Sequence, residues 1–370
     1  MNTTTLLKKL VEIESYSGQE QNLAGFIMTW AKEMSIPVEL QDNNVLIKFL
    51  GGSPKALIFD AHMDTVKPGS LNFWSDSPTG IGAGKMNGGK LYGLGASDDK
   101  SAIAALLTLA HQLNGFTLPI DVFIVFVTNE EISGAGSQSF VNYFQKKYAD
   151  KYTEVAAIIG EPTNLASIEI GHRGNIFLKT ITYGDSGHSS KPVKIKKHAV
   201  YENLKTIQKV SALGEKLSKK YEHKVLGAPS ICLTGIQSDS PSVNKIPSSC
   251  YSTWDVRTTP KLHNKLMHLI QKEVGNVATI EYMSPPAPFG FTSPKSKIIS
   301  LFKELVPNVE IKISPASNDI CFFTQAGIPT VTFGPGNKDV IHKPNEYVEM
   351  DRVNKSVVMY KQAVYLLNGL

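Results

Sequence analysis

The sequence predicts an α/β fold: a mostly parallel sheet with helices on both faces, and a smaller α+β domain inserted into it. Three observations lead to this prediction. Short apolar runs alternate with segments of helical periodicity. Several of these runs are apolar at nearly every position, as in strands buried on both faces. From Ile176 onward, apolar and polar residues alternate instead, as in strands buried on one face.

The continuous apolar runs and the helical segments between them define the larger domain. We assign residues 1–171 and 285–370 to it, so it is discontinuous in sequence. Its expected strands are Ala56–Phe59, Asp121–Val127, Ala156–Ile159 and Ile328–Phe333, and its expected helices are Leu6–Ile13, Leu23–Met34, Ser101–Leu113, Ser139–Tyr148 and Val353–Leu367. Alternation of this kind is typical of helices that cover a parallel sheet.

Residues 172–284 form the predicted inserted domain. Their elements follow the order β-α-β-β-α-β, which is typical of a ferredoxin-like arrangement. The expected strands are Ile176–Tyr183, Pro229–Ile236, Cys250–Arg257 and Ala278–Tyr282, and the expected helices are Lys197–Ser218 and Lys261–Val274. The proline-rich segment Ser284–Pro288 is the expected return linker.

Composition excludes several classes of function. The chain has 370 residues, of which 42% are hydrophobic and 19% charged, so a large core is expected and disorder is not. The net charge of +5 comes without the basic block expected of a nucleic-acid partner. The three cysteines are far apart and odd in number, which fits a reducing compartment. Without a signal peptide or an apolar span, we expect a cytoplasmic protein that does not bind membranes.

Acids and imidazoles follow the ends of the apolar runs or lie in glycine-rich turns. The five motifs are His62-Met63-Asp64, Asp98-Asp99, Glu130-Glu131, Gly160-Glu161-Pro162 and Ile341-His342-Lys343. Sites in open parallel sheets form at the carboxyl ends of the strands. Carboxylates gathered there repel each other unless cations neutralise them. The sequence therefore predicts a hydrolase that uses two metal ions.

Five side chains are the expected ligands of these ions. They are His62, Asp98, Glu131, Glu161 and His342. If Asp98 is shared, each ion has three protein ligands and keeps positions open for water and substrate. Nitrogen and oxygen donors without thiolate favour two Zn²⁺, with Co²⁺ or Mn²⁺ as substitutes. Spacing from Gly95 favours Asp98 over Asp99 as the bridging acid, and Asp99 stays open as the alternative.

Two further acids have expected roles beside the metal ions. Asp64 follows His62 by two residues and is expected to orient the imidazole ring, as carboxylates commonly do for histidine ligands. Glu130 precedes the expected ligand Glu131, and neighbouring side chains point in different directions. Glu130 is therefore the expected general base that removes a proton from the attacking water.

Taken in order, these motifs resemble those of the dinuclear zinc amidohydrolase and exopeptidase family. This family includes acetylornithine deacetylase, succinyl-diaminopimelate desuccinylase, acetyl-lysine deacetylase and related carboxypeptidases. The resemblance covers nearly the full length and implies a catalytic domain with an inserted lid and dimerisation domain. It implies a homodimer that cleaves small N-acyl amino acids in amino-acid biosynthesis. Glu161 stands where several peptidases of the family have Asp, which favours a deacylase.

The resemblance also implies roles for residues of the lid. Gly187-His188-Ser189-Ser190-Lys191-Pro192 matches the lid motif, whose histidine reaches the active site of the partner subunit and polarises the scissile carbonyl. Asn244–Pro247 and Trp254–Pro260 match two further motifs. The implied substrate-binding residues are Arg257 and Arg173 as carboxylate ligands, Asn244, and Gly334, which lines the pocket below His342.

Three positions depart from the common family pattern. Asp99 stands where many members have an uncharged residue, Leu94 replaces a frequent arginine, and Ser101 replaces a frequent glycine. The family also implies a cis peptide bond after the bridging aspartate. The alternatives to a deacylase are a dipeptidase or carboxypeptidase of the same family, a non-catalytic binding protein on this scaffold, and an enzyme that uses one metal ion.

Overall fold

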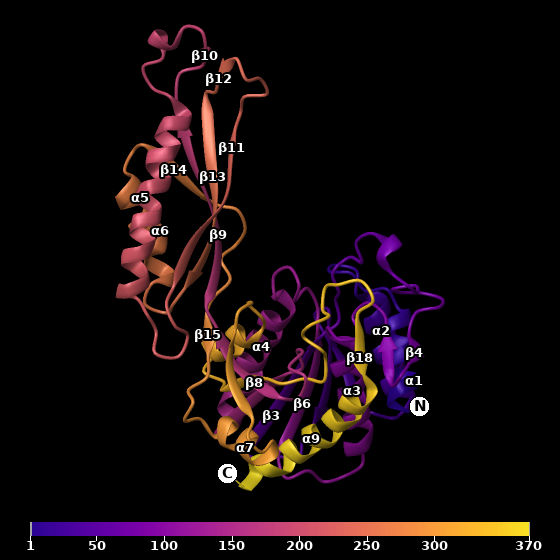
Figure 1. The fold of residues 1–370 in the computed structure, drawn as a ribbon. Helices are drawn as coiled ribbons and strands as arrows, with labels where there is room; N and C mark the ends of the chain where they lie inside the picture. The colour runs from indigo at the N-terminus through magenta and orange to yellow at the C-terminus, as the bar shows by residue number, and fades with distance from the viewer. Residues whose placement is uncertain (1, 370) are drawn as a thin grey trace. The chain divides into compact units, whose positions relative to one another are not determined.

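The computed structural model describes residues 2–369 and divides the chain into two compact units. The larger unit comprises the residues up to Gly171, then Phe291–Ser314, and then the residues from Asn318 onward. The smaller unit comprises His172–Gly290 and Pro315–Ser317. Figure 1 shows the elements of each unit.

A sheet of nine strands forms the centre of the larger unit, in the order β1-β2-β6-β3-β7-β17-β8-β15, with β16 paired to β8. The strands are β1 (Val38–Gln41), β2 (Asn44–Phe49), β3 (Lys55–His62), β6 (Asp121–Val127), β7 (Glu154–Ile159), β8 (Ser167–His172), β15 (Gly290–Phe291), β16 (Glu310–Ser314) and β17 (Thr330–Thr332). The four central strands β6, β3, β7 and β17 run parallel, and the pairs β1–β2, β2–β6 and β17–β8 are antiparallel. The predicted mostly parallel sheet is confirmed.

Strand register aligns the carboxyl ends of the three strands at the centre. His62 on β3 lies opposite Val127, the last residue of β6, and Asp60 lies opposite Ile159, the last residue of β7. β6 and β7 end where their apolar runs end, and β3 continues past Phe59 to His62. The residues that follow β6 and β7 therefore emerge beside His62 at one edge of the sheet.

Helices cover both faces of this sheet. They are α1 (Thr3–Glu12), α2 (Gln21–Glu33), α3 (Lys100–Leu113), α4 (Ala135–Tyr148), α7 (Lys297–Leu305), α8 (Ile320–Gln325) and α9 (Met350–Gly369). Phe140 and Phe144 of α4 and Phe323 of α8 pack in one buried cluster with strand residues such as Ile58. On the other face, Phe59 contacts Tyr360 of α9, which packs against α3 and α7.

The smaller unit has the predicted β-α-β-β-α-β order. Its elements are β9 (Gly174–Tyr183), α5 (Ala199–Lys220), β11 (Ser230–Ser238), β13 (Ser249–Thr258), α6 (Leu266–Val274) and β14 (Ala278–Tyr282). Its four strands pair antiparallel in the order β11-β13-β9-β14. Figure 1 shows α5 and α6 side by side along this sheet, and their apolar residues share a buried cluster with Trp254.

Several elements differ from the sequence-based expectation. The helix expected from Lys261 begins at Leu266, after a 3₁₀ turn at His263–Lys265, and the strand expected at Ile328–Phe333 is limited to Thr330–Thr332. The hairpin β1–β2 was not predicted. Its two-residue turn, Asp42-Asn43, has a positive φ of 51° at Asp42, and this pair of residue types is the signal that could have revealed it.

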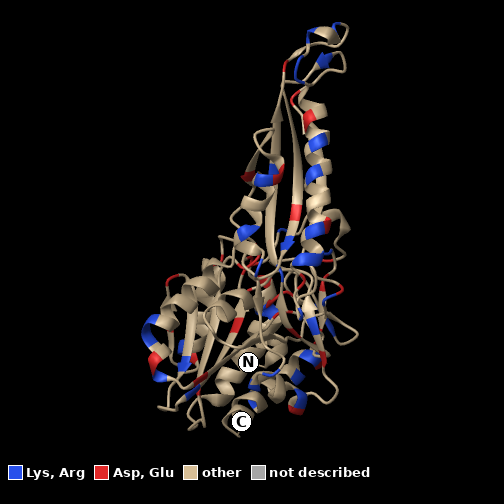
Figure 2. Cartoon of the chain, turned by 90° about the vertical axis from the view of Figure 1, so that its left-hand side faces the viewer, with Lys and Arg blue, Asp and Glu red and all other residues tan. Residues whose placement is uncertain are grey.

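Two smaller sheets complete the described elements. β18 (Tyr347–Glu349) pairs with β5 (Lys90–Tyr92), which pairs with β4 (Lys85–Asn87), and β10 (Gly187–His188) pairs with β12 (Lys245–Ile246). Figure 2 shows Lys and Arg as well as Asp and Glu on elements of both units. Among residues 2–369, we find no helix whose length and hydropathy together suffice for a membrane span.

A substitution at Gly334 can test how closely the segments at the edge of the sheet pack. A Cβ at this position would lie 1.6 Å from the carbonyl oxygen of Gly160, so the backbone must shift to accept a side chain. We expect Gly334→Ala to lower the free energy of unfolding by ~1–3 kcal/mol or more, measured by urea denaturation.

A matched glycine provides the control for this variant. Gly25 lies inside α2, and a Cβ there would meet no atom within 4 Å. We expect Gly25→Ala to raise the free energy of unfolding by ~0.5–1 kcal/mol. A Gly334→Ala protein as stable as wild type would contradict the close approach.

Candidate metal centre

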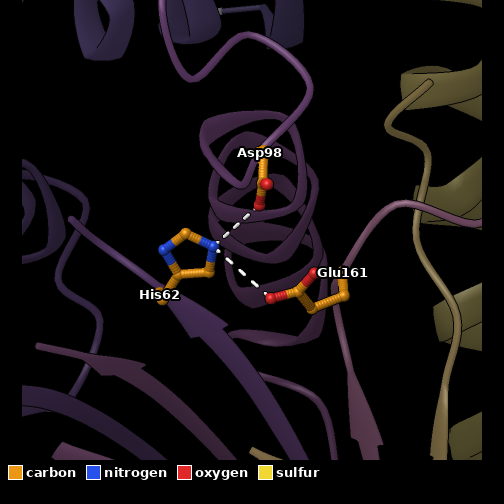
Figure 3. Close-up of side chains that lie close together, drawn as sticks. All are labelled: His62, Asp98 and Glu161. Atoms are coloured by element: carbon orange, nitrogen blue, oxygen red, sulfur yellow. Dashed lines mark hydrogen bonds and ion pairs between the residues drawn. The ribbon is translucent and has the colours of Figure 1, made fainter. Parts of the chain in front are cut away.

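The five predicted ligands converge in the larger unit. His62 is the last residue of β3, and Glu131 and Glu161 follow β6 and β7 at the same edge of the sheet. Asp98 precedes α3, and His342 lies in the loop before β18. Figure 3 shows His62 at the end of its strand, with Asp98 and Glu161 turned toward its ring.

These side chains form two groups that each can hold a cation, and Asp98 belongs to both. In the first group, His62 Nε2 lies 2.9 Å from Asp98 Oδ1 and 3.6 Å from Glu161 Oε1. In the second group, His342 Nε2 lies 2.9 Å from Glu131 Oε1 and 3.3 Å from Asp98 Oδ2. The two oxygens of Asp98 thus face different groups, as a bridging carboxylate requires.

Asp99 lies in a different environment from Asp98. Its side chain is fully buried, belongs to neither group, and neither carboxylate oxygen has a hydrogen-bond partner among the described residues. The peptide bond between Asp98 and Asp99 is cis. The geometry therefore favours Asp98 over Asp99 as the acid shared by two cations.

The buried carboxylate of Asp64 organises the residues around it. Its Oδ1 accepts the backbone N–H of Glu130 at 3.0 Å, and its Oδ2 accepts the N–H of Glu131 at 3.1 Å and the hydroxyl of Ser17 at 2.7 Å. His62 Nδ1 lies 3.5 Å from Asp64 Oδ1 and donates to the backbone carbonyl of Asp64 at 2.9 Å. This leaves His62 Nε2 as the ring nitrogen that can bind a cation.

The acids of the cluster repel one another. Burial and the charge of Glu161 raise the pKa of Glu130 well above its ordinary value, and burial and the charge of Asp98 do the same for the pKa of Glu161. Hydrogen bonds to Asp98 and Glu131 raise the pKa of His342 to about 10. Burial alone would lower the pKa of His62, but hydrogen bonds to Asp64 and Asp98 raise it well above its ordinary value.

This arrangement fits two divalent cations. Without cations, the cluster holds protons on groups that must be deprotonated to act as ligands. The donors are imidazole nitrogen and carboxylate oxygen, a set that suits zinc and also cobalt or manganese. Each group of three leaves room for the open positions that a catalytic site needs. The five residues are therefore close enough together and of suitable type to hold two cations, and their roles as ligands stay predictions.

Two sets of buried acids at this edge were missed by the sequence analysis. The hydroxyl of Ser137 lies 2.8 Å from Asp60 Oδ2 and 2.6 Å from Asp319 Oδ2, so it joins β3 to the beginnings of α4 and α8. Glu346 accepts three backbone N–H groups, including that of Asp98. Asp60 lies two residues before His62 at the end of an apolar strand, which was a usable signal. No sequence signal marked Asp319 or Glu346.

The remaining predicted residues, apart from Gly334, lie in the smaller unit. His188 is exposed at the end of β10, where Ser189 donates its N–H to the carbonyl of Asn244 at 2.9 Å. Arg257 is already paired with Asp255, through Nε–Oδ1 at 2.8 Å and Nη2–Oδ2 at 3.0 Å.

Arg173 donates to the carbonyl of Ala228 at 2.7 Å. Gly334 belongs to the larger unit and packs against the backbone of Gly160 and Glu161. The roles of His188, Asn244, Arg257, Arg173 and Gly334 in substrate binding stay predictions.

Comparison with known proteins identifies a matching family, relatives in sequence and solved structures with a similar fold. Residues 58–366 match the model of Peptidase family M20/M25/M40. An acetylornithine deacetylase of Klebsiella pneumoniae (strain 342) is 25% identical over 367 residues, which cover 95% of this chain and 92% of that protein. A metallo-carboxypeptidase of Sulfolobus solfataricus has a similar fold, with a TM-score of 0.77, 18% identity and coverage of 100% of both chains.

A dinuclear metal-binding peptidase of Bacillus subtilis also has this fold, with a TM-score of 0.70 and 15% identity over 99% of this chain and 98% of that one. The match of residues 58–366 to the family model confirms the family resemblance predicted from the motifs.

Metal binding to this cluster should depend on pH. The pKa of His342 is about 10 without cations, so its imidazole is protonated at neutral pH and must lose a proton to bind a cation. We expect the apparent affinity for Zn²⁺ to rise with pH through the neutral range, by ~tenfold per pH unit for each proton displaced. Titration against a competing chelator at several pH values measures this slope.

The variant His342→Ala is the control for this measurement. It removes one titrating group, so both the affinity of the second group and the slope with pH should fall. An affinity that does not change with pH would contradict the assignment of His342.

Proposed function

We infer that this chain, which belongs to Peptidase family M20/M25/M40, uses two divalent cations to hydrolyse the amide bond of an N-acyl amino acid. Family membership makes it a hydrolytic enzyme. One observation carries the inference to a two-cation centre: Asp98 turns one oxygen toward His62 and the other toward His342, within two groups of ligands. Cleavage of an N-acyl amino acid is supported by the Klebsiella relative, an acetylornithine deacetylase.

The two groups define which residues would hold the cations. His62 and Glu161 would hold one, Glu131 and His342 the other, and Asp98 both. Two Zn²⁺ suit these donors, and Co²⁺ or Mn²⁺ are substitutes. A pair of divalent cations polarises a substrate carbonyl and lowers the pKa of water toward ~7.

Glu130 acts as the general base in this proposal. Its backbone N–H donates to Asp64 Oδ1 at 3.0 Å, and this hydrogen bond fixes the position of the Glu130 backbone beside Glu131. Burial and the charge of Glu161 raise the pKa of Glu130, which favours proton uptake near neutral pH. Glu130 accepts a proton from the attacking water and returns it to the nitrogen of the leaving amine. The products are a carboxylate and a free amino acid.

The smaller unit contributes His188, which stabilises negative charge on the carbonyl oxygen. The backbone N–H of Ser190 donates to His188 Nδ1 at 3.2 Å, so Nδ1 is an acceptor and the hydrogen of the neutral ring is on Nε2. An exposed Nε2–H is the donor that a developing oxyanion needs. By family resemblance, His188 acts on the active site of the second subunit of a homodimer formed through the inserted domain.

Arg257 binds the substrate carboxylate in this proposal, Arg173 is a second carboxylate ligand, and Asn244 is a further substrate-binding residue. The pairing of Arg257 with Asp255 leaves its Nη1 as the part of the guanidinium free of that ion pair. A substrate carboxylate would therefore compete with Asp255 or share the guanidinium with it. Gly334 keeps the segment beside Glu161 close to the sheet edge.

The second candidate function is exopeptidase activity, as a dipeptidase or carboxypeptidase. It is supported by the similarity in fold to the Sulfolobus metallo-carboxypeptidase. The same pair of cations and the same base serve both reactions, so the substrate decides between them. Glu161, where several peptidases of the family have Asp, favours the deacylase.

A single activity screen tests the choice of substrate. Purified protein with added Zn²⁺ or Co²⁺ is offered acetyl- and succinyl-amino acids beside dipeptides and C-terminally varied peptides, and release of free amino acid is measured. We expect faster hydrolysis of an acyl amino acid than of any peptide. Preference for peptides would establish the exopeptidase instead. Bound metal without hydrolysis of any substrate would indicate a binding protein, and activity at one equivalent would indicate a one-metal enzyme.

The role of Glu130 has its own test. We expect Glu130→Ala to bind two cations as wild type does but to lose ~10²–10⁴-fold or more in turnover, because proton transfer loses its base. Steady-state kinetics and elemental analysis measure the two properties. Glu33→Ala, at an exposed position at the end of α2, is the control and should keep wild-type turnover. Near-wild-type turnover in Glu130→Ala would refute the assignment.

A further inference from the structure

Glu346 is a buried acid that the proposed reaction does not use. Glu346 is 1% exposed and lies four positions after His342 in the sequence. Its Oε1 accepts the backbone N–H of Ser97 at 2.8 Å and of Asp98 at 3.0 Å, and its Oε2 accepts the N–H of Gly95 at 3.1 Å. The turn before α3 thus wraps three N–H groups around one carboxylate, an arrangement that stabilises an anion.

The local backbone explains why this turn can reach around a carboxylate. Gly95 has a φ of 76°, and a Cβ there would lie 2.7 Å from Thr65 Cγ2, so a side chain is excluded. The buried ammonium of Lys100 interacts electrostatically with Glu346 and donates to the carbonyl of Ile13 at 2.7 Å. The three N–H groups offset only part of the cost of burying Glu346, because burial and the charge of Asp98 still raise its pKa to about 8.

A second set of bonds joins the same two segments. Ser97 Oγ donates to the carbonyl of Tyr347 at 2.6 Å and accepts the N–H of Asn337 at 2.8 Å. The carbonyl of Glu346 accepts the N–H of Gly93 at 2.9 Å. The segment 337–347 is thus attached to the turn 93–98 on both sides of His342.

We propose that Glu346 is a positioning residue that fixes the spacing between Asp98 and His342 and so controls occupancy of the second cation position. This inference rests on the two-cation centre proposed above. His62 and Glu161 adjoin strands of the sheet, whereas His342 lies in a loop and its side chain is 46% exposed. The second group takes two ligands, Asp98 and His342, from the segments that Glu346 joins, whereas the first group takes only Asp98 from them. The geometry of the second group therefore depends more on Glu346.

The variant Glu346→Gln tests this role with little change in volume. An amide oxygen can still accept the N–H groups of Ser97 and Asp98, but the amide NH₂ then faces the N–H of Gly95, donor against donor. We expect the second cation to bind ~10–100-fold more weakly and the first to bind within a few-fold of wild type. Titration of metal-free protein with Co²⁺, followed by visible absorption and elemental analysis, resolves the two steps without measuring activity.

Two further variants accompany Glu346→Gln. Glu349→Gln is the control for loss of a carboxylate on the same segment. Glu349 lies on β18, and its Oε1 accepts from Asn337 Nδ2 at 3.4 Å, an interaction that an amide oxygen keeps, whereas the ion pair of its Oε2 with Arg352 Nη1 at 3.2 Å is lost. It should bind both cations as wild type does. Ser97→Ala removes the two side-chain hydrogen bonds between the segments and leaves the Glu346 carboxylate in place. It should weaken the second cation selectively, by less than Glu346→Gln.

The outcomes separate this inference from the proposed function. Circular dichroism of the metal-free variants shows whether each is folded. Selective loss of the second cation in folded Glu346→Gln supports the inference, whereas two wild-type binding steps, or equal weakening of both, overturn it. If Glu346→Gln does not fold, the same criteria applied to Ser97→Ala decide. A wild-type protein that binds fewer than two cations overturns the two-cation centre itself.

Discussion

Mutual repulsion of buried and half-buried carboxylates at one edge of the large sheet is the constraint on which the site depends. Glu130 and Glu161 each have a pKa raised by burial and by a neighbouring acid. A charge buried without a partner costs several kcal/mol, so such a cluster persists only when protons or cations neutralise it. Asp98 offers one oxygen to each imidazole. Two divalent cations bound between these groups would relieve the repulsion and would supply the charge that polarises a carbonyl.

The protein holds these acids in place with neutral donors, which leave the net negative charge available to cations. Asp64 accepts two backbone N–H groups from the turn that carries Glu130 and Glu131, and a hydroxyl from Ser17. Ser137 Oγ lies between Asp60 Oδ2 and Asp319 Oδ2 and donates its one hydrogen to one of them, and burial raises the pKa of both acids. Hydrogen bonds of this kind fix direction with little effect on total charge. The scaffold therefore supplies geometry, and the proposed cations supply charge.

Much of the fold and part of the site could be predicted because their signals are local. The strands at Asp121–Val127 and Ala278–Tyr282 have the predicted bounds, since a run of apolar or alternating residues is visible within the strand itself. The hairpin β1–β2 was missed because its strands are short and its turn signal is a single residue pair. Glu346 was missed because its partners are backbone N–H groups 248–251 positions away, and backbone groups carry no sequence signature.

The sequence by itself determined that His62, Glu131 and Glu161 lie at one edge of the sheet, because each ends or follows a strand that an apolar run predicts. Asp98 and His342 lie in turns away from the strand ends, and the fold brings them there. Only the tertiary structure decided that Asp98 turns to both imidazoles while the adjacent Asp99 is buried with no hydrogen-bond partner for its oxygens within residues 2–369. The choice between two neighbouring aspartates depends on the direction of each side chain. That direction is set by packing and hydrogen bonds from segments far apart in the chain, which no local pattern records.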